Sequence, residues 1–144
     1  MTIMNDGFST TITFADTSGV AGVTFKEKEV TPPAIQGGGE NDTTTMRNTT
    51  WRTRQPKQLK TLDQCSFTAA YDAALYDSIL ALINANQLIT ITFPDGDTLA
   101  FWGWLDDFTP GANVEGEQPE ADLTIICSNQ NDSGVETAPV YAAA

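Results

Sequence analysis

Hydrophobic and polar residues alternate along two runs of the chain, 88–93 and 97–105, on either side of Pro94-Asp95-Gly96. Proline favours the first central position of a type I turn, aspartate suits the second, and glycine accepts the left-handed position that follows. The pattern predicts a hairpin with a three-residue loop in which Phe93 pairs with Asp97. In this register the core-facing set is Ile89, Ile91, Phe93, Leu99, Phe101 and Leu105. The opposite face carries Thr90, Thr92, Thr98, Ala100, Trp102 and Trp104.

Four further segments have the composition of strands. Alternating apolar and polar residues predict strands at 22–30, 65–71 and 121–127. The β-branched content of residues 43–54 favours another strand, although this segment lacks an apolar face wide enough for a core. The clearest alternation is at 65–71, whose inward side is formed by Cys65, Phe67, Ala69 and Tyr71.

One helix is expected between these strands. Asp72 is a suitable N-cap because its side-chain oxygen can accept from the free amides of the first turn, and the helix runs to about Asn84. A broad apolar stripe predicts that the helix packs onto a sheet; it consists of Leu75, Ile79, Leu82 and Ile83, with Tyr76 and Leu80 beside them. One helix among about six mostly antiparallel strands indicates a mainly β (α+β) fold, an antiparallel β-sandwich or partial barrel with one packed α-helix.

The length of 144 residues suits one domain. We expect the folded domain to span residues 22–128, with an N-terminal arm at 1–21 and a C-terminal arm at 129–144, because both end segments are mostly polar. The sequence shows neither a basic leader followed by an apolar run nor an apolar stretch of about 18 residues. We therefore expect a protein that is made in a cytoplasm and does not span a membrane.

Charge divides the chain into two parts. Nineteen acids and seven bases give a net charge of −12, and all seven bases lie in residues 26–60. Residues 61–144 hold thirteen acids and no base. This segregation suits contact between a basic segment of one copy and an acidic surface of the next, a heterologous contact that makes rings or filaments. The acidic balance argues against ordinary nucleic-acid binding. An acidic surface without a special role is the simpler interpretation of the same pattern.

The residues that enzymes and metal sites need are absent or poorly placed. There is no histidine, which excludes Ser-His-Asp and Cys-His catalysis and histidine-based metal sites. The triple glycine at 37–39 is not followed by the Gly-Lys-Ser/Thr of a phosphate loop. Carboxylates in residues 109–120 lie among Gly and Pro, so they fit a solvated loop better than a hydrolase site. We therefore expect no enzyme activity, no metal and no cofactor.

Three parts of the sequence follow one another in a recognisable order. The first runs from Phe25-Lys-Glu-Lys-Glu-Val30 through Thr31-Pro-Pro-Ala-Ile-Gln-Gly37 to Asp42-Thr-Thr-Thr-Met-Arg-Asn48. The second is Ile91-Thr-Phe-Pro-Asp-Gly96 with the aromatic-Gly-aromatic of 102–104, and the third is Glu117-Gln-Pro119 before the last strand. Their order and spacing resemble those of phage tail tube proteins, the major tail proteins of long non-contractile tails. The resemblance covers residues 22–128 and includes no catalytic signature.

This resemblance implies a homohexameric ring in which strands of neighbouring subunits join into one inner barrel. Stacked rings would form a tube around a tape-measure protein, and tail-tip and terminator proteins would meet its ends. DNA would pass through the lumen without specific binding. The expected location is the virion tail, assembled in the cytoplasm of a bacterial host.

Two alternatives stay open. One is the tube protein of a contractile tail or of a secretion-type injection system, which would have the same fold inside a sheath. The other is a carbohydrate-binding β-sandwich in which Trp51, Trp102 and Trp104 stack on sugar rings. Packing under the helix or at a subunit contact explains these tryptophans more simply.

The sequence suggests two sets of contact residues. The first set joins subunits or rings, and pairs Arg47, Trp51, Arg52, Arg54, Lys57 and Lys60 of one copy with Asp106, Asp107, Glu115, Glu117 and Glu120 of another. The second set faces the lumen, because a polar face in a sheet otherwise built for burial must meet water; it contains Thr90, Thr92, Thr98, Asp122 and Thr124.

Overall fold

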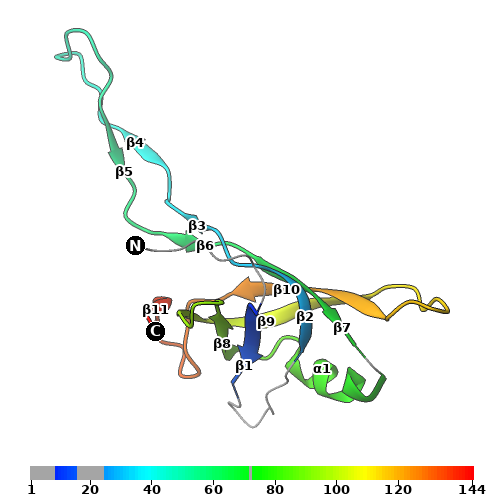
Figure 1. Ribbon diagram of the computed structural model, residues 1–144. Coiled ribbons are helices and arrows are strands. Elements are labelled where there is room, and N and C mark those ends of the chain that lie inside the picture. The colour runs from blue at the N-terminus through cyan, green and yellow to red at the C-terminus, as the bar shows by residue number, and fades with distance from the viewer. Residues whose placement is uncertain (1–8, 16–24, 72) are drawn as a thin grey trace.

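The computed structural model describes residues 9–15, 25–71 and 73–144 and consists of a curved antiparallel sheet, a short helix and a long arm (Figure 1). The strands lie in the order β1-β8-β9-β10-β7-β2, and β11 pairs with β9. Their bounds are β1 Thr11–Phe14, β2 Lys26–Thr31, β7 Cys65–Ala70, β8 Gln87–Thr92, β9 Thr98–Pro110, β10 Glu120–Cys127 and β11 Val140–Ala142. The predicted mainly β fold with one packed helix is confirmed.

The central hairpin of the sheet has the predicted loop and register. The Phe93 amide donates to the Asp97 carbonyl at 2.8 Å, and Gly96 has a φ of 94°. The ladder between β8 and β9 then aligns Ile91 with Leu99. Because the loop length fixes this register, it also decides which side chains of both strands enter the core.

The core lies inside the curve of the sheet. At its open side the two end strands approach each other: the rings of Phe14 and Phe25 pack edge to face with centroids 5.6 Å apart. The Ile12 amide also donates to the Glu27 carboxylate at 3.1 Å. Among the described residues no ladder joins β1 to β2, so the sheet curls without closing into a barrel. The largest fully buried side chains are Phe101, Ile12, Ile79, Leu82, Ile89, Ile91, Leu105, Leu123, Ile125, Gln87 and Cys65.

The helix α1 (Tyr76–Leu82) is shorter than predicted and follows a 3-10 turn at Ala73–Leu75. The predicted N-cap, Asp72, lies outside the described residues. Asn84 has a φ of 63°, a left-handed conformation that asparagine tolerates better than most residues, and the chain turns there toward β8. The helix packs against the sheet through its buried side chains, Ile79 and Leu82.

Both end segments predicted as arms contribute strands to the sheet. β1 lies within residues 1–21, pairs with β8, and buries Ile12 and Phe14 in the core. β11 lies within residues 129–144 and pairs with Thr98–Ala100 of β9. Residues 11–14 and 140–142 of the two predicted arms are therefore ordered by pairing within the subunit's own sheet. Strands of three or four residues are too short for an alternating pattern to stand out from a polar background.

An arm made of two short ladders projects from the sheet (Figure 1). At its root β3 (Ile35–Gln36) pairs with β6 (Thr61–Leu62), and further out β4 (Glu40–Asp42) pairs with β5 (Arg54–Pro56). The strand predicted at 43–54 was wrong, because most of this segment forms the loop at the tip of the arm. Its β-branched residues favour extended backbone but have no neighbouring strand to pair with.

The register gives a direct stability test. Ile91 is fully buried, whereas Thr92 is only half-buried on the opposite face. We expect Ile91→Ala to lower the free energy of unfolding by about 2–5 kcal/mol because it leaves a cavity. We expect Thr92→Ala to cost less than about 1 kcal/mol, the size of a cross-strand pair. Urea unfolding of the two variants measures both values, and equal losses would contradict the register.

Asp97 also holds the end of the chain against the hairpin. Its carboxylate accepts hydrogen bonds from the Tyr141 hydroxyl and from the Ala144 amide, the latter at 2.9 Å. The Tyr141 hydroxyl, followed by the Ala144 amide, lowers the pKa of Asp97 below its ordinary value of 3.8. The same bond raises the pKa of Tyr141. The attachment of β11 is therefore linked to the ionisation of Asp97.

A pH titration tests this attachment. Since the pKa of Asp97 is depressed in the folded state, its stabilising effect is present above pH 3.8 and is lost as the pH falls through the folded-state pKa. We expect the NMR signals of Tyr141 to shift toward those of an unattached chain in this acidic range. Asp97→Asn should remove the pH dependence, whereas Asp95→Asn in the same turn should keep it. An unchanged titration in Asp97→Asn would contradict the role of Asp97.

Candidate assembly surfaces

The arm is exposed along its whole length. No residue from 37 to 60 is buried. Near the tip, Trp51 is 81% exposed and Met46 is fully exposed. A two-stranded ribbon without an apolar face is marginally stable in water. Apolar side chains this exposed, on an element that has no core of its own, mark a surface suited to contact with another molecule.

Polar contacts within the tip give it a defined shape. The Thr43 hydroxyl lies 3.1 Å from the Thr53 hydroxyl, and the Thr43 amide donates to the Thr53 carbonyl at 3.0 Å. The Asn48 side-chain amide donates to the Trp51 carbonyl at 2.8 Å and thereby closes the loop. These bonds replace a hydrophobic core as the source of local order, so the tip presents Trp51 on a formed loop.

Ion pairs within the arm occupy two of the bases that the sequence assigns to a neighbour. Arg52 lies 3.3 Å from Asp42, and Arg54 lies 3.1 Å from Glu40. Both pairs bridge β4 and β5 or their immediate flanks. The Thr44 amide donates to the Asp42 carboxylate at 2.9 Å. The Thr44 side chain, followed by this amide, holds the pKa of the Asp42 carboxyl below its ordinary value.

Three bases of the arm therefore remain for contact with a partner. Among the described residues, Arg47, Lys57 and Lys60 form no ion pair. Arg47 lies in the tip loop, while Lys57 and Lys60 lie between the two ladders on the returning side of the arm.

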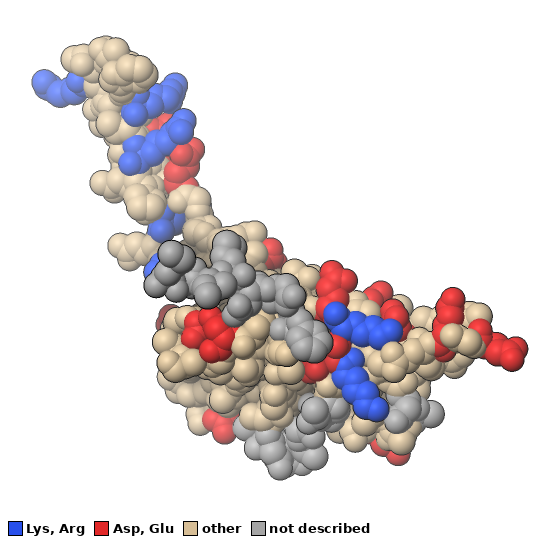
Figure 2. All heavy atoms as spheres, viewed as in Figure 1, with Lys and Arg blue, Asp and Glu red and all other residues tan. Residues whose placement is uncertain are grey.

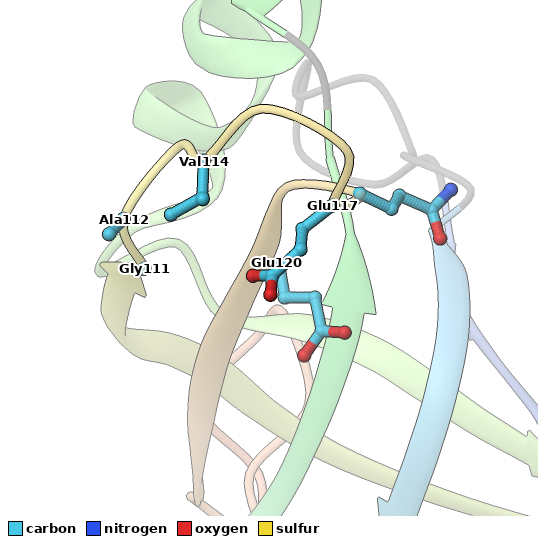
Figure 3. A pocket seen from close by; sticks show the side chains of 6 residues that line it. Gly111, Ala112, Val114, Glu117 and Glu120 are labelled. Carbon is cyan, nitrogen blue, oxygen red and sulfur yellow. The ribbon is translucent and has the colours of Figure 1, made fainter.

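The acidic surface is the loop of residues 111–119 between β9 and β10. Figure 3 shows the side chains of Glu117 and Glu120 close together in a hollow of about 600 Å³. Gly111, Ala112, Val114 and Gln118 complete its lining. Glu120, at the start of β10, is already paired with Lys28 at 2.5 Å. The unpaired acids of the loop are therefore Glu115 and Glu117, since no described base lies within ion-pair distance of either.

The two aspartates predicted to join this surface lie on β9 itself. The ladder between β9 and β10 shifts register here, with Leu105 and Asp107 opposite consecutive residues of β10, so Asp106 is the extra residue of a bulge. The Asp107 carboxylate accepts from the Thr109 hydroxyl at 3.2 Å. The structure thus brings Glu117 and Glu120 together and separates Asp106 and Asp107 from them along the strand.

The basic arm and the acidic loop lie at opposite ends of the molecule. Figure 2 shows Lys and Arg along the arm and Asp and Glu at the far end of the body, beyond the sheet. One copy therefore cannot bring its own arm and its own loop together. Contact between these two surfaces requires a second copy, and the same contact can then repeat.

The threonines predicted for a lumen lie on the face of the sheet that points away from the core. Thr90 and Thr92 pair with Thr13 and Thr11 of β1, and Thr92 also lies opposite Thr98. The sequence analysis missed the two β1 threonines, although Thr-Ile-Thr-Phe at 11–14 alternates in the same way. Together these residues form a hydroxyl-rich surface across β1, β8 and β9.

Asp122 and Thr124 lie on the same face but at its other end. Asp122 accepts from the Thr68 hydroxyl at 2.9 Å, and Thr124 lies opposite Asp107. Asp107 is nine residues along β9 from Thr98, a distance of about 30 Å in an extended strand. The residues predicted to line the lumen therefore lie on one face of the sheet but at opposite ends of it. Trp102 and Trp104 lie between the two groups. Trp51 is on the arm, so the three tryptophans form no common platform.

Comparison with known proteins gives a fold but no family. No protein-family model matches the sequence, and no curated protein matches it. Among solved structures, a chain from the tail of an empty gene transfer agent (GTA) particle with C6 symmetry is 13% identical, with a TM-score of 0.66, and covers 97% of this chain and 100% of its own. This likeness is one of fold.

Two further structures show the same fold. A chain from the virion of a native gene transfer agent particle is 11% identical, with a TM-score of 0.66, over 97% of this chain and 100% of that one. A chain from the six-fold symmetrised baseplate of the anti-feeding prophage (AFP) is 8% identical, with a TM-score of 0.66, over 99% of this chain and 98% of that one. The matches span the sheet, the helix and the arm.

The described part of the chain has neither a membrane-spanning helix nor a cluster of metal-binding side chains. No helix there is long and apolar enough to cross a membrane. No group of three or more Asp, Glu, Cys or His side chains there is arranged to hold a metal ion. The surfaces that stand out are thus the arm, the acidic loop and the threonine-rich face.

Proposed function

We propose that this protein is a structural subunit of a phage-like tail, and that six copies form a ring that stacks into a tail tube for DNA. The fold shared with chains of a GTA tail of C6 symmetry and of an AFP baseplate supports a tail component. The observation that carries the proposal is the arm: it has no core of its own, exposes apolar side chains and lies opposite the acidic loop.

Assembly through the arm is heterologous, because the contact joins two different surfaces, the arm of one copy and the acidic loop of the next. Such contacts close into rings or continue as stacks, which are the two arrangements that a tube requires. Each exposed ion pair contributes only about 0–1 kcal/mol, so the charged contacts act by repetition over many subunits. Trp51 and Met46 add the apolar area that a stable contact needs at its centre.

The contact set follows from the ion pairs inside the arm. Arg52 and Arg54 hold β4 and β5 together, so their part in assembly is to shape the arm. Arg47, Lys57 and Lys60 are the bases that meet the acids of a neighbour. Within the acidic loop, Glu115 and Glu117 are their partners, since Glu120 is paired with Lys28.

A second function has its own support. The fold shared with a chain of the AFP baseplate supports keeping a second candidate, the tube subunit of a contractile tail or of a secretion-type injection system. The subunit would assemble in the same way in both cases. Electron microscopy of the particle from which the protein comes separates the two, because only one of them surrounds the tube with a sheath.

Assembly of the purified protein tests the proposal. Negative-stain images should show rings or tubes at low salt, and fewer of them at high salt because exposed ion pairs are screened. Trp51→Ser combined with Met46→Ser should yield a folded subunit that assembles poorly, since both side chains are exposed in the free chain.

The control for that variant is Leu80→Ser, which removes an apolar side chain that is 65% exposed on the helix. It should assemble like the unmodified protein. Monodisperse unmodified protein at high concentration and low salt would contradict the proposed function. Normal tubes from the Trp51→Ser/Met46→Ser protein would exclude the arm tip as a contact.

We also propose that the threonine-rich face lines the lumen, because a hydroxyl surface meets water and offers no positive charge to hold DNA. Introducing Thr90→Lys and Thr92→Lys should slow DNA ejection by attracting phosphates while tubes still form. The long lysine stems can lie along the sheet with their charges in water. Ser133→Lys, on an exposed loop, is the matched control. Equal ejection rates for both proteins would contradict a lumen position for this face.

A further inference from the structure

A groove lies where the root of the arm meets the C-terminal segment. Its volume is about 290 Å³, and one wall is formed by Ile35 and residues 58–62. The other wall is formed by residues 136–139, with Asn129 at the end. Of the residues assigned to assembly above, Lys60 alone lines this groove.

The groove combines exposed apolar side chains with one lysine and one glutamate, Lys60 and Glu136. Ile35 is 71% exposed and Leu59 is 81% exposed, although both line the same hollow. Single exposed apolar side chains are normal on a protein surface, but two that flank one groove form a place for an apolar side chain of a partner. Lys60 lies in the same lining and forms no ion pair among the described residues. An apolar side chain beside an acid therefore fits the arm-root wall, where Leu59 and Lys60 are adjacent, while Glu136 lies on the opposite wall.

The acidic loop has this chemistry. Val114 is 51% exposed and is followed at once by Glu115, with Glu117 two residues further on. The Glu117 amide donates to the Val114 carbonyl at 3.1 Å, so the three residues lie on one tight turn. This turn presents an apolar side chain together with two unpaired carboxylates at the end of the molecule.

We propose that the groove receives the 111–119 loop of a second copy, with Val114 between Ile35 and Leu59 and with Glu115 or Glu117 against Lys60. The inference rests on the proposed self-assembly and names the residues of one contact in it. The groove lies on the arm side of the body and the loop at the opposite end, so a copy cannot fill its own groove (Figures 1 and 2). Each copy then both gives and receives a loop.

This contact explains observations that the charge pattern alone does not explain. It explains why an acidic loop exposes a valine at its turn and why the root of the arm exposes two large apolar residues. It also leaves the exposed apolar side chains of the tip, Trp51 and Met46, for a different part of the assembly. The arm therefore has two contact regions, a root that receives a loop and a tip that reaches further.

Cysteine cross-linking tests the pairing directly. A chain with Val114→Cys and Leu59→Cys, assembled at low salt and oxidised, should give a covalent ladder on a denaturing gel, because each copy is joined to two others. Chains with only one of the two changes should stop at dimers. The native Cys65 is buried and Cys127 is half-buried, so the unmodified protein should give no ladder.

The matched control combines Val114→Cys with Leu80→Cys, which is exposed on the helix and outside the groove. It should form no ladder. If tubes are present in the microscope and the Val114→Cys/Leu59→Cys chain gives no more ladder than this control, the inference is overturned while the proposed function stands. If the unmodified protein makes neither rings nor tubes, both fall.

Point variants supply an independent measurement. Leu59→Asp and Val114→Asp should each raise the protein concentration needed for assembly at least about tenfold, the size expected for loss of one buried valine-sized contact. Leu80→Asp should leave it unchanged. Lys60→Glu should weaken assembly, and adding Glu115→Lys and Glu117→Lys should restore part of it. Thermal unfolding of the free subunits should be unaltered, since these side chains are exposed; unchanged assembly of Leu59→Asp and Val114→Asp would overturn the contact.

Discussion

The three-residue loop at Pro94-Asp95-Gly96 fixes the register on which the rest of the sheet depends. The bond from the Phe93 amide to the Asp97 carbonyl sets which residues of β8 and β9 face the core. β1 pairs on the outer edge of β8, while β10 and β11 pair along β9, so their faces follow from the same register. A loop one residue shorter would shift the pairing of β8 with β9 by one residue and mix the core-facing and polar residues on each face. One turn thus defines both the core and the polar face.

The sequence predicted those parts of the fold whose signals are local. Alternation at 65–71 and 88–105, with the Pro-Asp-Gly turn between two runs, was enough for the core strands and their register. It did not reveal β1 or β11, because a strand of three or four residues is defined by the edge on which it pairs. The sequence pattern also predicted a strand at 43–54, where the β propensity is high but no partner strand exists. Local sequence patterns therefore failed to predict the structure wherever pairing with a distant strand decides it.

The candidate contact residues could likewise be predicted only in part from the sequence. The segregation of bases and acids was visible in the sequence, and the structure places the two at opposite ends of the molecule. The cross-strand pairs of Arg52 with Asp42 and of Arg54 with Glu40 were not foreseen, because they depend on the register of the arm hairpin. The groove at the arm root was equally hidden, since its two walls are some seventy residues apart in the chain. The charge pattern predicts contacts between copies, and the fold identifies which charged residues are unpaired and so can make them.

The charge distribution also restricts how copies can meet. With a net charge of −12, two bodies that approach face to face repel each other, so contact without the arm is unfavourable. At physiological ionic strength this repulsion is screened beyond about 8 Å, so it does not prevent a close contact between surfaces of opposite charge. An arm that carries unpaired bases away from the acidic body makes one orientation attractive while the others stay repulsive. Specificity then comes from repulsion in the wrong orientations as much as from attraction in the right one. This suits the proposed subunit, which joins its copies many times in a single orientation.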